Sequence, residues 1–427
     1  MTCKNLLFSF LFNISKALLI IIISGVPAHS QVVGCKDPLA NNYNPLATIN
    51  NGTCAYNTTA YTPSLKVDPI SDTLLETSGL QWAGNYLWSF NDGGGEAAIY
   101  RIDTISNALL QRVYLQGATN IDWEDIAFDG MYFYVGDFGN NVTGARNDLK
   151  IYKFPLSAIP DYVANPVVYI PSSQITIINF TYSDQQQPTT PTGSNNTKFD
   201  CEAMIVDNGK IHLFSKNWID LNCTHYKINS VVAGTYIATV VETLFTNYLV
   251  TAADKAIGNR VVALLGYQNS GTANHFMYLL SDYTGENYFS GNKRRIDLPG
   301  VTVMGQAEGV TFKNGYYGYI SNEKFVRIIG GFPFTVTPKL RAFDIRNYVS
   351  NLLVTYIFTG SGNWDEPSNW SDQLMPPPAM AANCQIIIDP LPGGECRLNI
   401  PYTAITGSPI TVTAGKIFVV QGNLTQE

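Results

Sequence analysis

The chain has 427 residues, of which 45% are hydrophobic and only 14% are charged. A chain of this length can bury a large core or form several domains. The formal net charge of −7 argues against a nucleic-acid surface, because phosphate binding requires clustered Lys and Arg. Frequent Gly, Tyr and Phe, without a sustained helical apolar period, predict an all-β protein.

Residues 1–30 are typical of a secretory signal peptide. Lys4 precedes apolar runs, and small residues around Ala28 provide a cleavage site before Gln31. The alternative is an uncleaved membrane anchor, but Asn13, Ser15 and Lys16 interrupt the apolar stretch, and the run after them is short for a span. We therefore expect a secreted or cell-surface protein with no stable membrane span after cleavage.

Residues 31–60 form an Asp- and Asn-rich segment bounded by Cys35 and Cys54. Its pattern GC-x-DP-x-A-x-NYNP resembles a short module of secreted Bacteroidota proteins, which is similar to the calcium loops of thrombospondin type 3 repeats. The resemblance implies a second calcium loop with oxygen ligands from Asp37, Asn41, Asn42, Asn44 and Asn50. Because only one of these is a carboxylate, the favoured interpretation is a disulfide-stapled spacer in which the same residues make turns.

A short motif recurs through residues 61–346, which we assign to a β-propeller. Each copy continues into a Gly- or Asn-bearing turn and an aromatic strand that ends in a polar cluster. The copies open at Glu76, Glu124, Glu202 and Glu308, with a weaker one at Thr251 to Asp254. Their intervals of roughly 50 residues match one four-stranded propeller blade.

The interval between Glu124 and Glu202 is longer than the others and has room for one further blade. A degenerate unit around Val167 to Tyr182 would fill it. The spacing therefore favours six blades, with five as the rival.

Equivalent positions of successive blades point toward one axis, so the repeated acids are expected to gather at one mouth of the channel. Crowded carboxylates must hold a cation, pair with Arg or Lys, or take up protons. Structural ion pairing and calcium binding stay open as alternatives here. The candidate metal ligands are Glu76, Asp122, Glu124, Asp137, Glu202, Asp254 and Glu308.

Several of these motifs resemble those of a known family of secreted bacterial propellers. The segments are Asp122 to Asp129, Gly136 to Asn140, Asp200 to Met204 and Gly305 to Val310. They are similar to lipoprotein-like or esterase-like phytase propellers of Bacteroidota. The resemblance implies a propeller fold, but propellers host enzymes and binding proteins alike.

Two functions therefore remain. The first is a propeller that binds a cation and an extracellular glycan, protein or phosphorylated small molecule at the channel mouth. The alternative is a calcium-dependent phosphoesterase or esterase-like hydrolase, in which a metal-bound water attacks the substrate. Its candidate catalytic residues are Glu124, Glu202, Lys216 and Arg146. Whether the protein is an enzyme stays open at this point.

Six cysteines follow the signal segment, and an even number in an exported chain predicts disulfides. Fifteen pairings are formally possible for six cysteines. The simplest expectation is local pairing of Cys35 with Cys54, Cys201 with Cys223, and Cys384 with Cys396.

Residues 347–427 form a linker and a small C-terminal β module. Trp364 and Trp370 could stack on sugar rings or act as hydrophobic staples, which is the commoner use. Short β runs follow, and the alternatives of a truncated module and of partner strands from elsewhere both stay open.

Overall fold

The computed structural model describes residues 31–268, 274–350, 352–373, 375–378, 383–405 and 408–426. The predicted signal peptide, residues 1–30, lies outside the described residues. Strands dominate, and the helical segments are single turns at α1 (Val301–Met304), η1 (Leu156–Ala158), η2 (Ser172–Gln174), η3 (Tyr288–Ser290), η4 (Pro367–Asn369) and η5 (Ser371–Gln373). The described part of the chain contains no helix with the length and apolarity that a membrane crossing requires.

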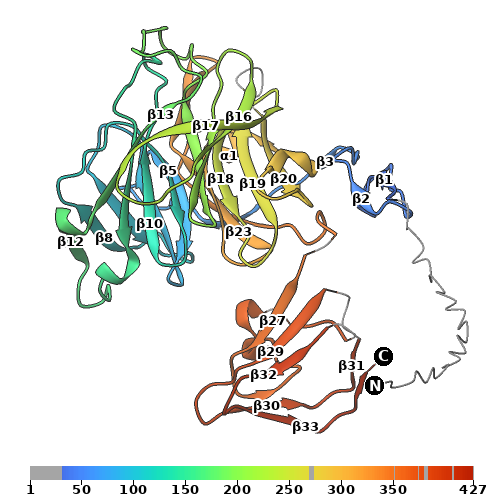
Figure 1. Cartoon of the computed structure of the whole chain (residues 1–427). Helices are drawn as coiled ribbons and strands as arrows, with labels where there is room; N and C mark the ends of the chain where they lie inside the picture. The colour runs from blue at the N-terminus through green and yellow to red at the C-terminus, as the bar shows by residue number, and fades with distance from the viewer. Residues whose placement is uncertain are drawn as a thin grey trace, which may run out of the picture.

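Most of the chain folds into antiparallel four-stranded sheets that follow one another along the sequence (Figure 1). The first sheet holds β5 (Thr77–Ala83), β6 (Tyr86–Asn91), β7 (Ala98–Ile102) and β8 (Leu109–Leu115). The second holds β9 (Trp123–Phe128), β10 (Tyr132–Asp137), β11 (Lys150–Pro155) and β13 (Thr176–Tyr182). The third holds β14 (Cys201–Asp207), β15 (Lys210–Ser215), β16 (Asn222–Ile228) and β17 (Gly234–Phe245). The fourth holds β18 (Leu249–Lys255), β19 (Val261–Tyr267), β20 (Asn274–Ser281) and β21 (Asn292–Gly300).

The fifth sheet closes the ring with strands from both ends of the domain. It combines β22 (Gln306–Phe312), β23 (Tyr317–Glu323) and β26 (Leu340–Asp344) with β4 (Ser64–Val67), which precedes the first sheet in sequence. Strand β4 pairs antiparallel with β26 at the outer edge. The first and last parts of the propeller are thereby joined by backbone hydrogen bonds.

The innermost strands of the sheets form a closed ring, which makes the fold a β-propeller. Strand β5 packs against β9, β9 against β14, β14 against β18, β18 against β22, and β22 returns to β5. The ring therefore has five blades, so the favoured expectation of six is wrong and the rival of five is correct. Every copy of the sequence motif lies on one of these innermost strands.

The expected degenerate unit around 167–182 is not a blade. Strand β12 (Val167–Ile170) pairs in parallel with β8 and extends the outer edge of blade 1. Strand β13 is the outermost strand of blade 2, and it also pairs in parallel with β17 of blade 3. The long interval between two motifs is therefore filled by edge strands and loops that decorate existing blades.

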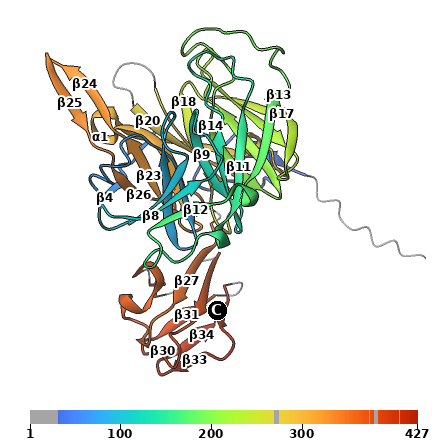
Figure 2. The ribbon, with the colours of Figure 1, turned by 90° about the vertical axis from the view of Figure 1, so that its left-hand side faces the viewer.

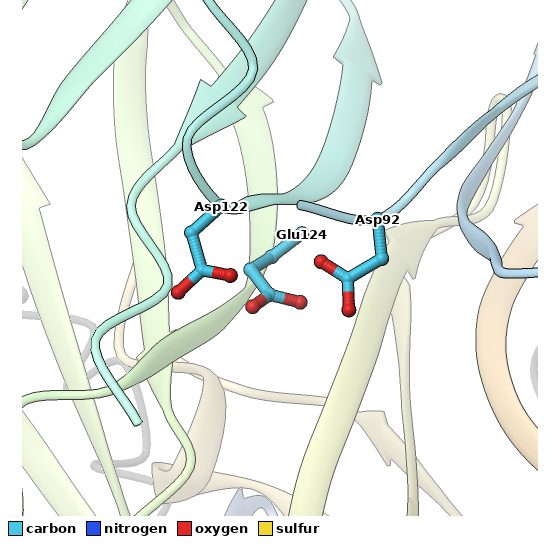
Figure 3. A group of neighbouring side chains, drawn as sticks. All are labelled: Asp92, Asp122 and Glu124. Atoms are coloured by element: carbon cyan, nitrogen blue, oxygen red, sulfur yellow. The ribbon is translucent and has the colours of Figure 1, made fainter. Parts of the chain in front are cut away.

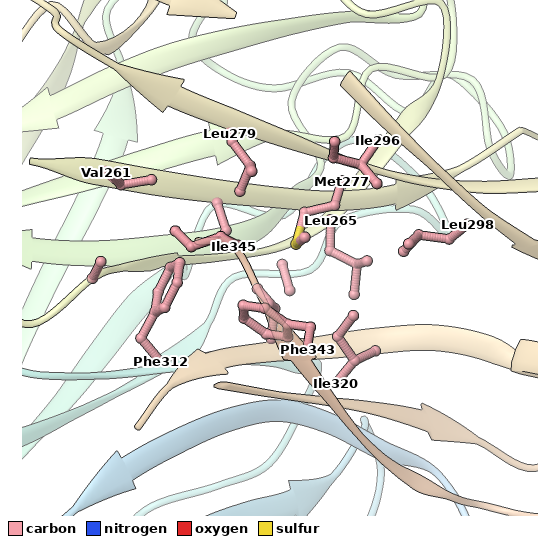
Figure 4. Packing of buried hydrophobic residues seen from close by; sticks show 14 of the residues in the cluster. Val261, Leu265, Met277, Leu279, Ile296, Leu298, Phe312, Ile320, Phe343 and Ile345 are labelled. Carbon is pink, nitrogen blue, oxygen red and sulfur yellow. The ribbon is translucent and has the colours of Figure 1, made fainter. Parts of the chain in front are cut away.

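Apolar side chains between neighbouring sheets hold the blades together. One cluster lies between blades 4 and 5, where strand residues of both sheets interdigitate (Figure 4). Its members include Val261, Leu265, Met277, Leu279, Ile296, Leu298, Phe312, Ile320, Phe343 and Ile345. Burial of such side chains contributes roughly 1.5–3 kcal/mol each, so the interfaces between blades are the main cores of the domain.

The N-terminal segment is stapled by a Cys35–Cys54 disulfide, as predicted. It contains β1 (Val33–Gly34) and β2 (Ile49–Asn50), which pair in parallel. A following strand, β3 (Thr59–Ala60), adds to the edge of blade 4 beside β21. The segment is also held by a hydrogen bond from Asn50 Nδ2 to Asn292 Oδ1 of 2.8 Å.

The C-terminal residues form three short parallel sheets, and the strands of each sheet come from successive turns of the chain (Figure 1). The first sheet holds β27 (Val354–Phe358), β29 (Cys384–Ile388) and β32 (Ile410–Val412). The second holds β28 (Gly362–Asn363), β30 (Glu395–Leu398) and β33 (Ile417–Val420), and the third β31 (Tyr402–Ala404) and β34 (Leu424–Gln426). Trp364 and Trp370 are buried edge-to-face in its core with ring centroids 4.7 Å apart, so they act as hydrophobic staples.

The other two predicted disulfides are wrong, because Cys201, Cys223, Cys384 and Cys396 are buried thiols outside any disulfide. Cys201 packs in the cluster between blades 2 and 3, whereas Cys223 packs between blades 3 and 4. The sheet of blade 3 therefore separates the first pair. Cys384 and Cys396 lie on strands of two different sheets of the C-terminal unit.

Candidate functional site: an acidic channel mouth

Each innermost strand carries an irregularity at the same point of its pairing with the second strand. The partner register skips one residue there, which is the signature of a β-bulge. The skipped residues are Gly79, Glu124, Glu202, Thr251 and Glu308 in blades 1 to 5. Three blades thus aim a glutamate from the same bulge position toward the axis.

The ends of the second strands provide a further set of polar groups at the same mouth. They are Asp92 just after β6, Asp137 at the end of β10, Lys216 just after β15, Tyr267 at the end of β19 and Glu323 at the end of β23. Asp122 and Asp200 precede β9 and β14. We call the carboxylates of Asp92, Asp122, Glu124, Asp137, Asp200, Glu202, Glu308 and Glu323 the acidic mouth.

Three of these carboxylates converge from blades 1 and 2. Asp92, Asp122 and Glu124 each offer an oxygen, and these oxygens all lie within 4.8 Å of one another (Figure 3). We call them the carboxylate trio. Calcium–oxygen distances are about 2.3–2.6 Å, so two ligands on opposite sides of a calcium ion are about 4.6–5.2 Å apart. The spacing of the trio fits oxygen ligands of one such cation.

Two glycines allow the backbone to approach the trio closely. A Cβ on Gly139 would lie 2.2 Å from Glu124 Oε1 and 2.5 Å from Asp122 Oδ2. A Cβ on Gly93 would lie 2.8 Å from Asp122 Oδ1. Side chains at these two positions would therefore fill the space around the acids, which explains why glycine is required there.

Two basic side chains neutralise part of the mouth. Lys216 Nζ lies 2.9 Å from Glu202 Oε2, and both side chains are almost fully buried. The Arg146 guanidinium is 2.8 Å from Asp137 Oδ1 and also binds Asp148 and the Gly139 carbonyl. The predicted ion pairing is therefore present at Lys216 and Arg146, but it leaves most of the carboxylates of the acidic mouth without a positively charged partner among the described residues.

Burial and mutual repulsion raise the pKa values of the acids that remain. Burial, with the neighbouring charges of Asp92, Glu202 and Asp122, holds the pKa of Glu124 well above its ordinary value. Burial and the charges of Asp92 and Asp200 raise the pKa of Asp122 to about 7. Burial and the charge of Glu308 raise the pKa of Glu323 to about 9. Without a cation, the mouth holds protons near neutral pH.

Some buried oxygens of the mouth lack a partner. Glu308 is 5% exposed, and its Oε1 accepts a hydrogen bond from Gln306 whereas its Oε2 has none. Asp137 is fully buried, and its Oδ2 also has none. A buried carboxylate oxygen left unsatisfied costs about 1–3 kcal/mol or more, so these atoms indicate a place for a cation or another donor.

Two of the predicted metal ligands lie elsewhere. Glu76 is exposed at the rim, because the bulge of blade 1 falls on Gly79, three residues later than the motif suggested. Asp254 lies deeper in the channel, where it accepts hydrogen bonds from the backbone of Phe312 and Lys255 and from Thr311 Oγ1. Its carboxylate ties blade 4 to blade 5 and is occupied by those donors.

The sequence interpretation also missed four residues of the mouth. Asp92, Asp200, Glu323 and Tyr267 were not selected, although the first and third lie in the polar clusters that end the second strands. Asp200 precedes its glutamate by two residues, as Asp122 does. The repeated D-x-E spacing could have identified Asp200. The position of Asp92, Tyr267 and Glu323 at the ends of the second strands could have identified the other three.

The second predicted metal loop has its side-chain oxygens engaged in turns. Asp37 accepts from Leu39 N and from the Tyr56 hydroxyl, at 2.9 and 2.6 Å. Among the other candidate ligands, the side-chain oxygens of Asn42, Asn44 and Asn50 also accept backbone N–H groups. Asn41 donates to Asn57. These bonds fit the spacer interpretation of the segment.

Two buried histidines lie away from the mouth. His212 and His225 are buried between blades 3 and 4, and His212 Nδ1 lies 2.8 Å from His225 Nε2. His225 Nδ1 lies 3.1 Å from Glu242 Oε1. Burial lowers the pKa of both rings, so they are neutral packing residues.

Fold and site together define a five-bladed β-propeller with a buried acidic mouth. No protein-family model matches the chain, and a search of curated proteins finds no match. Similar solved structures include the PQQ-bound aldose sugar dehydrogenase of Streptomyces coelicolor, with a TM-score of 0.35, 11% identity and coverage of 67% of this chain and 100% of that one.

Two further structures have comparable similarity. A putative exo-β-1,3-galactanase of Bifidobacterium bifidum has a TM-score of 0.34, 13% identity and coverage of 69% of this chain and 96% of that one. A GH43 β1,3-galactosidase solved with galactodeoxynojirimycin has a TM-score of 0.31, 11% identity and coverage of 62% and 93%. At such low scores the propeller assignment rests on the strand pairing of this chain.

Proposed function

We propose that the acidic mouth binds a divalent cation, with calcium favoured, and that this cation recruits an extracellular ligand. The observation that carries the proposal is the convergence of the carboxylate trio from two blades. Calcium prefers six to eight oxygen ligands. The trio would supply the protein ligands, and oxygens of water or of the bound ligand would complete the coordination.

The charge balance of the mouth supports a cation. Lys216 and Arg146 are both engaged in ion pairs, with Glu202 and Asp137. A divalent ion would relieve the repulsion that raises the pKa values of Asp122 and Glu124. The three acidic ligands favour calcium over magnesium. Magnesium sites usually contain one or two carboxylates, whereas the calcium shell is larger and more flexible.

The arrangement favours a binding function over the calcium-dependent hydrolase. A phosphoesterase would need basic side chains free to hold the phosphate. The candidates for that role, Lys216 and Arg146, already pair with acids of the mouth at 2.9 and 2.8 Å. We therefore propose a secreted or cell-surface propeller that binds an oxygen-rich ligand, such as a glycan, a protein or a phosphorylated small molecule, through its cation.

Calorimetric titration of the metal-stripped chain with calcium tests the proposal. We expect saturable binding to the wild type and binding weaker by roughly tenfold or more in Asp122→Asn and Glu124→Gln, because charge count sets calcium affinity. Asp72→Asn is the matched control, since Asp72 is an exposed acid outside the mouth. Equal binding by all four proteins would refute the site, and turnover of phosphomonoesters that depends on Glu124 would favour the hydrolase.

A further inference from the structure

A free-standing hairpin projects from the propeller (Figure 2). It is formed by β24 (Phe325–Ile329) and β25 (Phe332–Val336), which pair only with each other. The hairpin is inserted between β23 and β26 of blade 5, directly after Glu323 of the acidic mouth. Five residues per strand at about 3.3 Å each give an arm of about 17 Å.

The outer half of this hairpin is apolar and exposed. Ile328 is 65% exposed and Phe332 is 77% exposed, and Val326 follows at 53%. A two-residue Gly330–Gly331 turn with positive φ values joins the strands. An isolated two-stranded hairpin is only marginally stable in water. Burial of its exposed apolar side chains in an apolar phase would stabilise the arm.

The charges on the hairpin all have one sign. No Asp or Glu occurs from residue 324 to residue 343. Lys324 and Arg327 are exposed on the arm, and neither takes part in an ion pair among the described residues. Lys324 lies at the base of the arm and Arg327 at the middle of β24, so the turn end with Ile328 and Phe332 is apolar and positive charge follows it toward the base.

We propose that this hairpin inserts into an anionic lipid surface. The depth order fits that occupant, because interfacial segments bury apolar side chains about 5–10 Å deep while Lys and Arg remain at the headgroup level. Arg327 is three residues from Gly330, which corresponds to about 10 Å along a strand. A convex arm with a glycine tip suits a soft phase better than the rigid concave surface of a protein partner.

Co-sedimentation of the full chain with vesicles, in the presence of chelator, tests this inference independently of the cation site. Neutral phosphatidylcholine vesicles are compared with vesicles in which one third of the lipid is phosphatidylglycerol. We expect binding to the anionic vesicles that weakens with salt, since exposed polybasic contacts are screened. Absence of binding to the anionic vesicles would overturn the proposal.

Variants of the arm identify the contact. Lys324→Gln with Arg327→Gln should weaken binding to anionic vesicles roughly thirtyfold, because each basic residue near the surface contributes about 1 kcal/mol. Ile328→Ser with Phe332→Ser should weaken it by roughly tenfold or more, because two buried apolar side chains are lost. Ile105→Ser is the matched control, because Ile105 is 86% exposed in a turn of blade 1. Equal losses for the control, or a hairpin-dependent dimer in light scattering that accounts for the exposed surface, would refute the lipid contact.

Discussion

Two sets of buried carboxylates lie along the same channel, and they differ in what faces them. Deep in the channel, Asp125 accepts backbone N–H groups from Ile126 and Met204 at 2.8 and 2.7 Å. At the mouth, the side chain of the neighbouring residue Glu124 accepts no hydrogen bond from the described residues and faces other acids instead. A buried acid with donors is a structural tie, whereas one among other acids marks a ligand site.

The deep ties join four of the five pairs of neighbouring blades around the axis, and a Lys255–Asp207 ion pair joins blades 4 and 3. Ser78 Oγ donates to the Glu124 carbonyl, Asp125 accepts from Met204, Thr251 Oγ1 donates to the Ala307 carbonyl, and Trp82 N donates to Thr311 Oγ1. Asp254 links blade 4 to blade 5 through Phe312 N at 2.7 Å. The ring is thus rigid directly beneath the mouth, which holds the carboxylate trio in place.

The largest effect is expected from Asp125→Asn. The amide places an N–H₂ group against one of the two backbone N–H donors and leaves it unsatisfied in the core. We expect a loss of about 3 kcal/mol in the free energy of unfolding, measured by denaturant titration. Asp72→Asn, an exposed acid, should change it by less than about 0.5 kcal/mol.

The adjacent substitution Glu124→Gln makes the same chemical change with the opposite outcome. Because no hydrogen-bond donor among the described residues faces the Glu124 side chain, the amide leaves no backbone donor unsatisfied and should leave the metal-free stability within about 0.5 kcal/mol of the wild type. The variant should lose the increase in melting temperature that calcium gives the wild type. A loss of stability like that of Asp125→Asn would show that Glu124 is also a tie.

The pH dependence of stability tests whether a cation can replace the protons of the mouth. The raised pKa values of Asp122, about 7, and Glu323, about 9, mean that the folded chain binds more protons than the unfolded chain above about pH 4. Stability conferred by these acids is therefore present at low pH and is lost as pH rises through their folded pKa values.

We accordingly expect the melting temperature in chelator to fall between about pH 5 and pH 8. Saturating calcium should flatten this dependence, because the cation takes the place of the protons. Asp122→Asn with Glu323→Gln should show a shallower profile than the wild type without calcium, and the slope that Asp254 contributes, with its pKa of about 7, should remain. An identical slope with and without calcium would contradict cation binding at the mouth.

The repeated motif predicted the innermost strands correctly because each strand buries its own apolar face at the same point of a blade. It predicted three of the acids at the mouth, Glu124, Glu202 and Glu308, for the same reason. The prediction for Glu76 was wrong because the bulge of blade 1 falls at Gly79, three residues after the glutamate of the motif. The blade number failed because edge strands such as β12 occupy sequence without adding a blade.

The trio itself could not be read from the sequence in full. Asp92 follows the second strand of blade 1, whereas Asp122 and Glu124 belong to blade 2. Their contact depends on how the two sheets pack, which is set by the apolar residues between them rather than by the polar motif. The Cys201–Cys223 pairing failed similarly, since sequence separation alone does not show that the two residues face opposite sides of one sheet.

The smallest expected effect concerns those cysteines. Cys201 and Cys223 are fully buried, and burial raises the pKa of both thiols above the ordinary value. A thiol that cannot ionise does not react. We therefore expect the folded protein to resist a thiol-specific reagent and to react at the four thiols of its described part, including Cys384 and Cys396, only in denaturant.

Reductant added to the folded chain sharpens the contrast between the two kinds of sulfur. It should open the Cys35–Cys54 bond of the N-terminal segment and leave the melting transition of the propeller in place, because that bond lies outside the blades. Fewer than four reactive thiols in non-reducing denaturant, with recovery after reduction, would restore one of the predicted disulfides. If the restored bond were Cys201–Cys223, the strands of blade 3 would also have to pack differently, since these two residues lie in separate cores.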